Sequence, residues 1–179
     1  LDDPLYLGWR HKRVTGKQYD DFIDAFVESV KKNCPNAFLH WEDFGRDNAK
    51  RILDRHKDNL CSFNDDIQGT GVVAASAVIT GCKVNNQALH DQKIVIFGGG
   101  TAGIGIADQI CDIMIDSGIS EKFARKCFWI IDRNGLIIEG GKDIPDIQAS
   151  YVRELSDVSN WKLNNVENIR LLSCSWSFF

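Results

Sequence analysis

Apolar residues recur at helical spacing early in the chain and are then followed by a short continuous apolar run. Residues 18–33 place apolar side chains three and four positions apart, with acids early and Lys31 and Lys32 late. This pattern predicts an amphipathic helix whose charges suit its dipole. Residues 37–41 form a short apolar run that predicts a buried strand, and residues 46–59 predict a second helix with its charges outward.

A polar turn at residues 64–71 leads into residues 72–82, a run of small and β-branched side chains. Periodicity alone does not separate strand from helix there, but the length and the alanines favour a buried helix. Residues 85–92 are polar and predict a domain boundary. We therefore expect one segment over residues 1–84 and another beginning at residue 85.

The second segment alternates strand and helix. The pattern predicts a strand at residues 93–97, a glycine turn, a helix at 102–116, a lengthened loop at 117–126 and a strand at 127–131 that ends on Asp132. A strand–turn–helix–strand unit opens a doubly wound parallel sheet, so the fold class expected is α/β. We assign residues 85–172 to a partial Rossmann-like domain and residues 173–179 to an atypical tail.

Composition narrows the function classes. The chain has 179 residues, of which 44% are hydrophobic and 26% charged, and a net charge of -4. These values are ordinary for a globular protein and give no reason to expect nucleic acid or a membrane surface as partner. No apolar stretch approaches the roughly 20 residues that a membrane span needs. We expect a cytoplasmic protein; an organelle matrix stays open, because the chain begins at Leu1 and we expect the natural N-terminus to be missing.

The six cysteines show no C-x-x-C spacing, which argues against zinc and thioredoxin-like chemistry. Several of them lie in apolar runs, as Cys127 does. The pattern predicts buried free thiols in a reducing compartment.

The glycine turn fits G-x-G-x-x-G at Gly98, Gly100 and Gly103. In such a turn the first glycine makes the tight bend, the second admits a pyrophosphate and the third lets the helix pack closely on the sheet. The phosphate would lie at the helix N-terminus, where Thr101 and Ala102 begin the helix. The motif alone is weak, but here a strand precedes it and a helix follows it. A glycine-rich turn without a nucleotide remains the alternative.

Cofactor choice depends on the end of the second strand. Asp132 is placed to bind a ribose hydroxyl pair, which favours NAD because a 2′-phosphate would meet negative charge. Arg133, beside it, could instead pair with that phosphate. We favour NAD and keep NADP open.

Two acidic doublets, Glu42-Asp43 and Asp65-Asp66, follow apolar segments. They could be solvated acids or helix caps. They could also bind a hard cation, because oxygen ligands with no nearby histidine or cysteine suit Mg²⁺ or Mn²⁺ and not zinc. Such a cation would bind the hydroxyl and a carboxylate oxygen of a 2-hydroxy acid. We assign no catalytic role to a histidine, and we expect His40, which is adjacent to the first doublet, to point away from it.

Together these motifs resemble the malic enzymes. The matching runs are residues 3–8, 18–24, 41–44, 61–70, 98–107 and 131–136. The run Phe63-Asn64-Asp65-Asp66-Ile67-Gln68-Gly69-Thr70 is highly specific to that family. The resemblance covers residues 1–161 and implies the end of a malate- and metal-binding domain followed by the start of an NAD-binding domain.

The resemblance also implies roles for individual residues. Glu42, Asp43 and Asp66 would bind Mn²⁺ or Mg²⁺, and Asp65 would lie beside the catalytic base and support it. The glycines of the turn and Asp132 would hold the dinucleotide. The family reaction is oxidative decarboxylation of malate to pyruvate and CO₂ with reduction of NAD(P), and the family generally forms dimers and tetramers.

The sequence also departs from the family pattern. The family's catalytic lysine and tyrosine and a substrate-binding arginine lie upstream of the segment that matches Leu1, and asparagines that contact substrate lie downstream. The match fades after residue 161, and a truncation, a frameshift or an engineered end could account for the tail. We therefore expect the chain alone to be inactive. A malolactic enzyme, which converts malate to lactate, and a non-catalytic dinucleotide-binding module stay open as alternatives.

Overall fold

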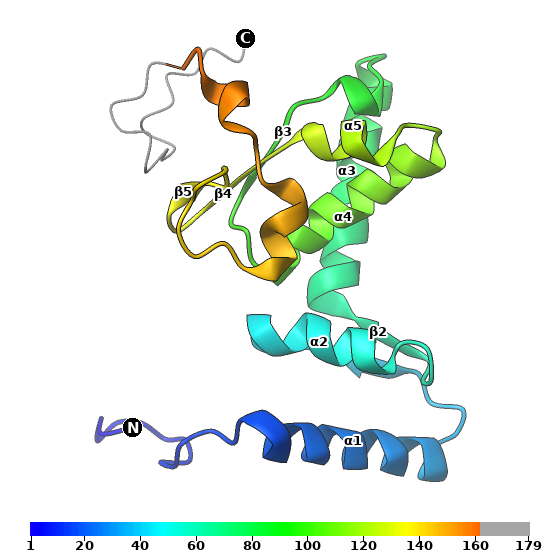
Figure 1. Ribbon diagram of the computed structural model, residues 1–179. Coiled ribbons are helices and arrows are strands. Elements are labelled where there is room, and N and C mark those ends of the chain that lie inside the picture. The colour runs from blue at the N-terminus through cyan, green and yellow to red at the C-terminus, as the bar shows by residue number, and fades with distance from the viewer. Residues whose placement is uncertain (162–179) are drawn as a thin grey trace.

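The structure is a computed structural model that describes residues 1–161. The predicted tail at 173–179 and Cys174 lie outside the described residues. An N-terminal layer and an α/β layer are joined by one long helix (Figure 1).

The N-terminal layer packs two helices around a small parallel sheet. Helix α1 spans Gly16–Asn33, strand β1 spans Leu39–Trp41, helix α2 spans Arg46–His56 and strand β2 spans Ser62–Asn64. The two strands are parallel. Their buried core consists of Ile23, Val27, Trp41, Ile52 and Leu53. Both helices predicted from the periodicity are confirmed.

The predicted strand at residues 37–41 is shorter than expected and buried on one side only. Trp41 is buried, whereas His40 and Phe38 are exposed. Because successive strand residues point to opposite faces, one apolar face is enough to anchor this strand.

The polar turn after β2 is helical. Asp65–Gly69 forms one π-helical turn, η1, and continues directly into α3, Thr70–Val84. The helix predicted at residues 72–82 is therefore confirmed. Its expected burial is wrong, because α3 is apolar on every side and the described residues cover only part of it: Val73 is 73% exposed.

The joined run Asp65–Val84 is 20 residues long, and its length and composition meet the criteria for a membrane span. The expectation that no apolar run approaches that length is wrong, because the π turn extends the helix upstream. Core helices of water-soluble proteins meet the same criteria, so this feature alone does not indicate a membrane.

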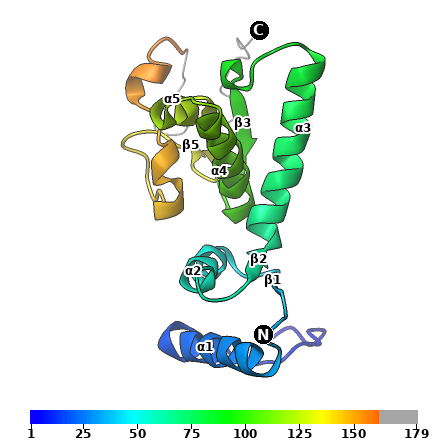
Figure 2. The same cartoon turned by 90° about the vertical axis from the view of Figure 1, so that its right-hand side faces the viewer.

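The α/β layer contains the predicted strand–turn–helix–strand unit. Strand β3 (Ile94–Phe97) leads through the glycine turn into α4 (Thr101–Asp116), and β4 (Phe128–Asp132) lies parallel to β3. Strand β5 (Gly135–Leu136) is antiparallel to β4, which gives the order β3-β4-β5. Helix α3 packs along α4 (Figure 2). The predicted α/β class is confirmed.

The loop predicted at 117–126 is wrong in part. Gly118, with φ +91°, ends α4, but Glu121–Lys126 forms a short helix, α5. Ala124 of α5 is completely buried against the core of this layer. With one buried residue in about two turns, this helix has no repeating apolar pattern from which it could be predicted.

The segment after β5 covers the layer with two 3₁₀ helices, Asp146–Tyr151 and Leu155–Val158. Tyr151 is buried, and its hydroxyl donates to the Asp108 carboxylate at 2.8 Å. Burial raises the pKa of Tyr151 well above its ordinary value. The phenol is therefore a neutral hydrogen-bond donor in the fold.

The five described cysteines are free thiols, as predicted. Cys82, Cys111 and Cys127 are buried, and burial raises the pKa of the Cys111 and Cys127 thiols. The prediction of burial is wrong for Cys34 and Cys61, which are exposed. Each of these two follows the end of a helix or a turn, where the chain runs along the surface.

Candidate metal and dinucleotide sites

The two acidic doublets converge because the strands before them are paired. In the β1–β2 register Trp41 lies opposite Asn64, so Glu42 and Asp65 are the next residues at the same edge of the sheet. The carboxyl ends of parallel strands meet at one edge. Two acidic pairs separated by more than twenty positions in the sequence are thereby brought together.

Three of these carboxylates form a group that could hold a metal ion. One oxygen each from Glu42, Asp43 and Asp66 lies within 4.8 Å of the others. The backbone N–H of Asp43 donates to Oδ2 of Asp66 at 2.9 Å, which links the two doublets directly. Asp43 has φ +58°, a left-handed conformation that is uncommon for residues other than glycine. Such local strain is concentrated at functional sites.

The π turn fixes the second doublet. Oδ1 of the fully buried Asn64 accepts from the N–H of Ile67 at 2.9 Å, and Oε1 of Gln68 accepts from the N–H of Asn64 at 3.0 Å. Asn64 therefore caps this turn, and neither aspartate has the capping role that the sequence left open. A side chain at Gly69 would collide with the Asp65 carboxylate. The run Asn64–Gly69 is thus a built structure that presents two carboxylates.

Glu42 and Asp43 also line a cavity of about 710 Å³. Its walls include Tyr19 and Phe22 from α1, and Arg13 contributes a cation. This volume lies in the range of small-molecule sites. A small dicarboxylate could therefore reach the carboxylate group from this side.

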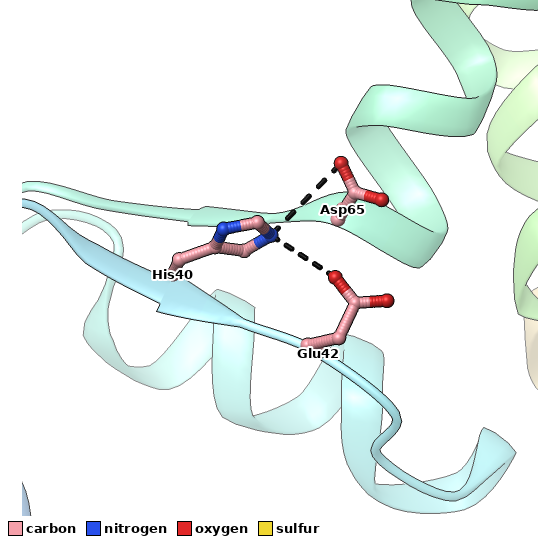
Figure 3. A group of neighbouring side chains, drawn as sticks. All are labelled: His40, Glu42 and Asp65. Carbon is pink, nitrogen blue, oxygen red and sulfur yellow. Dashed lines mark ion pairs between the residues drawn. The ribbon is translucent and has the colours of Figure 1, made fainter.

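His40 contradicts the expectation that it points away. Its Nε2 lies 3.1 Å from Oε2 of Glu42 and 3.9 Å from Oδ1 of Asp65 (Figure 3). His40 neighbours Trp41, not Glu42, and residues two apart in a strand share a face. The expectation was wrong because it treated His40 as the neighbour of the doublet, whereas Trp41 lies between His40 and Glu42.

The glycine turn has the backbone that the motif predicts. Gly98 has φ +114°, and Gly100 is the N-cap of α4, with open space around it. A Cβ at Gly103 would collide with the Gly98 carbonyl oxygen, so the helix lies as close to the turn as a glycine allows. Thr101 and Ala102 form the first turn of α4. The backbone is therefore open at the helix N-terminus, where a phosphate would bind.

Gln148 is a site residue that the sequence did not reveal. Its Nε2 donates to Oδ2 of Asp132 at 2.6 Å and to the Gly99 carbonyl oxygen at 2.7 Å. The N–H of Arg133 donates to the other carboxylate oxygen, Oδ1, at 2.9 Å. Asp132 is therefore held in place beside the glycine turn, and the Arg133 side chain is exposed.

Helix α4 brings the dinucleotide turn and the carboxylate group into one unit. A Cβ at Gly105 would lie 2.5 Å from the Ile67 carbonyl oxygen, and one at Gly71 would lie 3.0 Å from the Gly105 carbonyl oxygen. The N-terminal end of α4 therefore packs directly on the π turn that carries Asp65 and Asp66. This glycine-mediated contact fixes one site relative to the other.

Two family models match the chain. The model of the malic enzyme N-terminal domain matches residues 1–57, and the model of the malic enzyme NAD-binding domain matches residues 67–174. The chain belongs to the malic enzyme family. The resemblance stated from the motifs is confirmed, and so is the expectation of an NAD-binding domain.

Curated relatives agree with this assignment. The chain is 49% identical to NAD-dependent malic enzyme 3 of Bacillus subtilis, over 92% of this chain and 29% of that protein. It is 45% identical to the malolactic enzyme of Lactiplantibacillus plantarum, over 94% of this chain and 31% of that protein. The chain thus spans about 30% of the length of these two relatives.

Solved structures show the same fold. The NAD-dependent malic enzyme of Thermotoga maritima superposes with a TM-score of 0.61 at 22% identity, over 80% of this chain and 36% of that one. The malic enzyme of Entamoeba histolytica gives a TM-score of 0.60 at 20% identity, over 79% of this chain and 29% of that one. Neither comparison bears on the boundary predicted between residues 84 and 85, which stays a prediction.

Proposed function

We propose that this chain supplies the metal-binding carboxylates and the dinucleotide turn of a malic enzyme that converts malate to pyruvate and CO₂ with reduction of NAD. The observation that carries the proposal is the 2.9 Å hydrogen bond from the Asp43 N–H to the Asp66 carboxylate. It joins two acidic segments into one group of oxygen ligands. The contact between Gly105 and Ile67 places that group against the helix of the dinucleotide turn.

The donor set fits a hard divalent cation. Glu42, Asp43 and Asp66 offer carboxylate oxygens only, which suits Mn²⁺ or Mg²⁺ and leaves coordination positions for substrate oxygens. When bound, the cation would supply Lewis-acid polarisation at the C2 oxygen of malate, and NAD would accept the hydride. The three side chains bind and orient. Asp65 faces the same edge and is the residue that we assign to support proton transfer.

The dinucleotide contacts come from two places. The backbone at Gly98, Gly100 and Gly103, with the first residues of α4, would hold the pyrophosphate. Asp132, held by Gln148, would accept hydrogen bonds from the ribose hydroxyls. Its negative charge supports NAD over NADP, and Arg133 leaves some tolerance for the 2′-phosphate.

We further propose that the chain by itself does not turn over malate. The resemblance places the family's catalytic lysine and tyrosine upstream of the matching segment, and general-base help is worth about 10²–10⁴ in rate. The full-length protein is proposed to be a cytoplasmic homo-oligomer with residues 1–84 and 85–172 in separate domains. Turnover of malate by the chain alone would contradict the proposal, because a lysine or tyrosine of this chain would then have to act as the base.

A malolactic activity is the second candidate. The 45% identity to a malolactic enzyme supports it almost as well as the malic enzyme relatives support the first. Both reactions use malate, NAD and a divalent cation, so the carboxylate group serves either. The released product separates them: pyruvate with net NADH for one, lactate without net NADH for the other.

The deciding experiment follows malate consumption by the full-length parent protein with Mn²⁺ and NAD. Pyruvate and NADH in equal amounts support the malic enzyme reaction, and lactate supports the alternative. Asp66→Asn should remove metal-dependent turnover, whereas Asp116→Asn, an exposed aspartate at the end of α4, should keep it. Wild-type turnover in Asp66→Asn would contradict the metal assignment.

A further inference from the structure

A second group of metal-ligand atoms lies beside the first. His40, Glu42 and Asp65 each offer one ligand atom, and these atoms lie within 4.8 Å of one another. Nε2 of His40 is 3.1 Å from Oε2 of Glu42 and 3.9 Å from Oδ1 of Asp65, so the imidazole points between the two carboxylates (Figure 3). All three side chains are about half-exposed, so an ion from solution can reach them.

The backbone explains the convergence. His40 lies within β1 and Glu42 directly follows it, so both side chains are on one face of the strand, opposite the buried Trp41. Asp65 opens the π turn at the end of the neighbouring strand. Two segments, strand β1 with the residue that follows it and the π turn after β2, therefore present the three donors.

The imidazole is also held by an aromatic neighbour. Phe63, which lies opposite His40 in the β1–β2 register, meets the ring edge-on, with centroids 5.5 Å apart and an interplanar angle of 64°. This packing restricts rotation of the ring about its side-chain bonds. Nε2 is thus directed toward the carboxylates before any ligand arrives.

The donor set differs in kind from that of the neighbouring group. One imidazole nitrogen and two carboxylate oxygens suit Zn²⁺, Co²⁺ or Ni²⁺, whereas Mg²⁺ prefers oxygens alone. A tetrahedral ion with bonds of about 2.0–2.1 Å needs its ligand atoms about 3.3 Å apart. The two separations from His40 Nε2, 3.1 and 3.9 Å, lie within 1 Å of that value. Small side-chain rotations would complete three of four positions.

We propose that His40, Glu42 and Asp65 form a distinct site that binds a borderline divalent transition metal such as Zn²⁺ or Co²⁺. The site shares Glu42 with the proposed Mn²⁺/Mg²⁺ group. Two dications that share Glu42 would repel each other and divide its negative charge, so occupation of the His40 site weakens binding of the hard cation. The transition metal therefore competes with Mn²⁺ or Mg²⁺ without occupying the hard-cation group itself.

Cobalt is the probe of choice, because Co²⁺ bound with few ligands absorbs strongly in the visible range. The 179-residue chain is titrated with Co²⁺, and Mn²⁺ affinity is measured separately by the loss of the free-ion paramagnetic signal. His40→Gln should lower the ratio of Co²⁺ to Mn²⁺ affinity at least about tenfold. Asp66→Asn should raise the same ratio. His90→Gln is the matched control, because His90 lies 3.8 Å from the Asp91 carboxylate outside both groups, and it should leave the ratio unchanged.

X-ray absorption of the unmodified chain loaded with one equivalent of Zn²⁺ gives an answer that needs no variant. Imidazole scattering from one ligand supports the site, and a spectrum with oxygen ligands alone overturns it. An unchanged affinity ratio in His40→Gln also overturns it, since His40 would then be only an ion-pair partner of Glu42. If Co²⁺ binding depends on His40 while Mn²⁺ does not bind the wild-type chain, this inference stands and the proposed hard-cation site fails.

Discussion

The Gln148 amide joins Asp132 to the glycine turn, with hydrogen bonds of 2.6 Å to the Asp132 carboxylate and 2.7 Å to the Gly99 carbonyl oxygen. Gln148 is only 2% exposed, and it belongs to a 3₁₀ helix that follows the sheet. The residue proposed to recognise ribose is therefore positioned by a segment that is remote in sequence.

Replacing Gln148 with leucine should weaken NAD binding. A hydrogen bond to a charged group contributes about 1.5–3 kcal/mol, so the dissociation constant of NAD in the parent protein should rise roughly 10- to 100-fold. Calorimetric titration measures this directly. Gln92→Leu is a suitable control, since the Gln92 amide bonds locally to the Ala88 carbonyl at 2.9 Å. Unchanged NAD affinity in Gln148→Leu would show that Asp132 does not need this support.

Asp132 should set the preference between cofactors. Asp132→Ser should lower kcat/KM for NAD and raise that for NADP, because it removes the negative charge that repels a 2′-phosphate. Arg133→Ser should reduce activity with NADP and affect NAD little. The two values of kcat/KM for each variant, one with NAD and one with NADP, test this. A strong NADP preference in the wild-type protein would show that Arg133 determines the choice.

The contact between α4 and the π turn should tolerate no side chain. A Cβ at Gly105 would lie 2.5 Å from the Ile67 carbonyl oxygen, so Gly105→Ala should destabilise the chain by about 1–3 kcal/mol. Gly81 in α3 has nothing within 4 Å of its Cβ position, and Gly81→Ala should instead stabilise by about 0.5–1 kcal/mol. Urea denaturation compares the two. Equal effects of both substitutions would argue against a close α4–turn contact.

The ion pair between α1 and α2 should make stability depend on pH. The hydrogen bond from Arg55 holds the pKa of Asp24 below its ordinary value of 3.8, and the nearby positive charges of Arg55 and His56 act in the same direction. A depressed pKa in the folded state gives stability that is present above the unfolded value and is lost as the pH falls through the folded value. The melting temperature of Asp24→Asn should therefore fall below that of the wild type at pH 7 and approach it below about pH 4. Asp58→Asn, another exposed aspartate, should show no such convergence.

Much of the fold could be predicted from the period of the apolar residues. Helices α1 and α4 have clear helical periods, because each buries one face on a core, and the strand before the glycine turn stands out as a short apolar run. Helix α5 was missed, since it has six residues and buries Ala124 alone. The burial of α3 was overestimated, because an apolar helix without a polar face gives no sign of which side is covered.

In the candidate sites, too, the local motifs could be predicted from the sequence and the contacts between distant segments could not. The acidic doublets and the glycines are local motifs, and sequence was enough to single them out. The hydrogen bond from Asp43 to Asp66 and the support of Asp132 by Gln148 depend on strand register and on a distant segment. His40 could have been found by applying strand alternation from Glu42 backward. Gln148 has no local signal, because a buried glutamine in a 3₁₀ helix has no characteristic spacing.

Mn²⁺ binding by the 179-residue chain tests the proposed metal site most directly. We expect one bound Mn²⁺, with Asp66→Asn weakening it at least about tenfold and Asp116→Asn leaving it as in the wild type. The free-ion paramagnetic signal during titration gives each dissociation constant. Equal Mn²⁺ affinity in the wild type and Asp66→Asn would contradict a metal site formed by Glu42, Asp43 and Asp66.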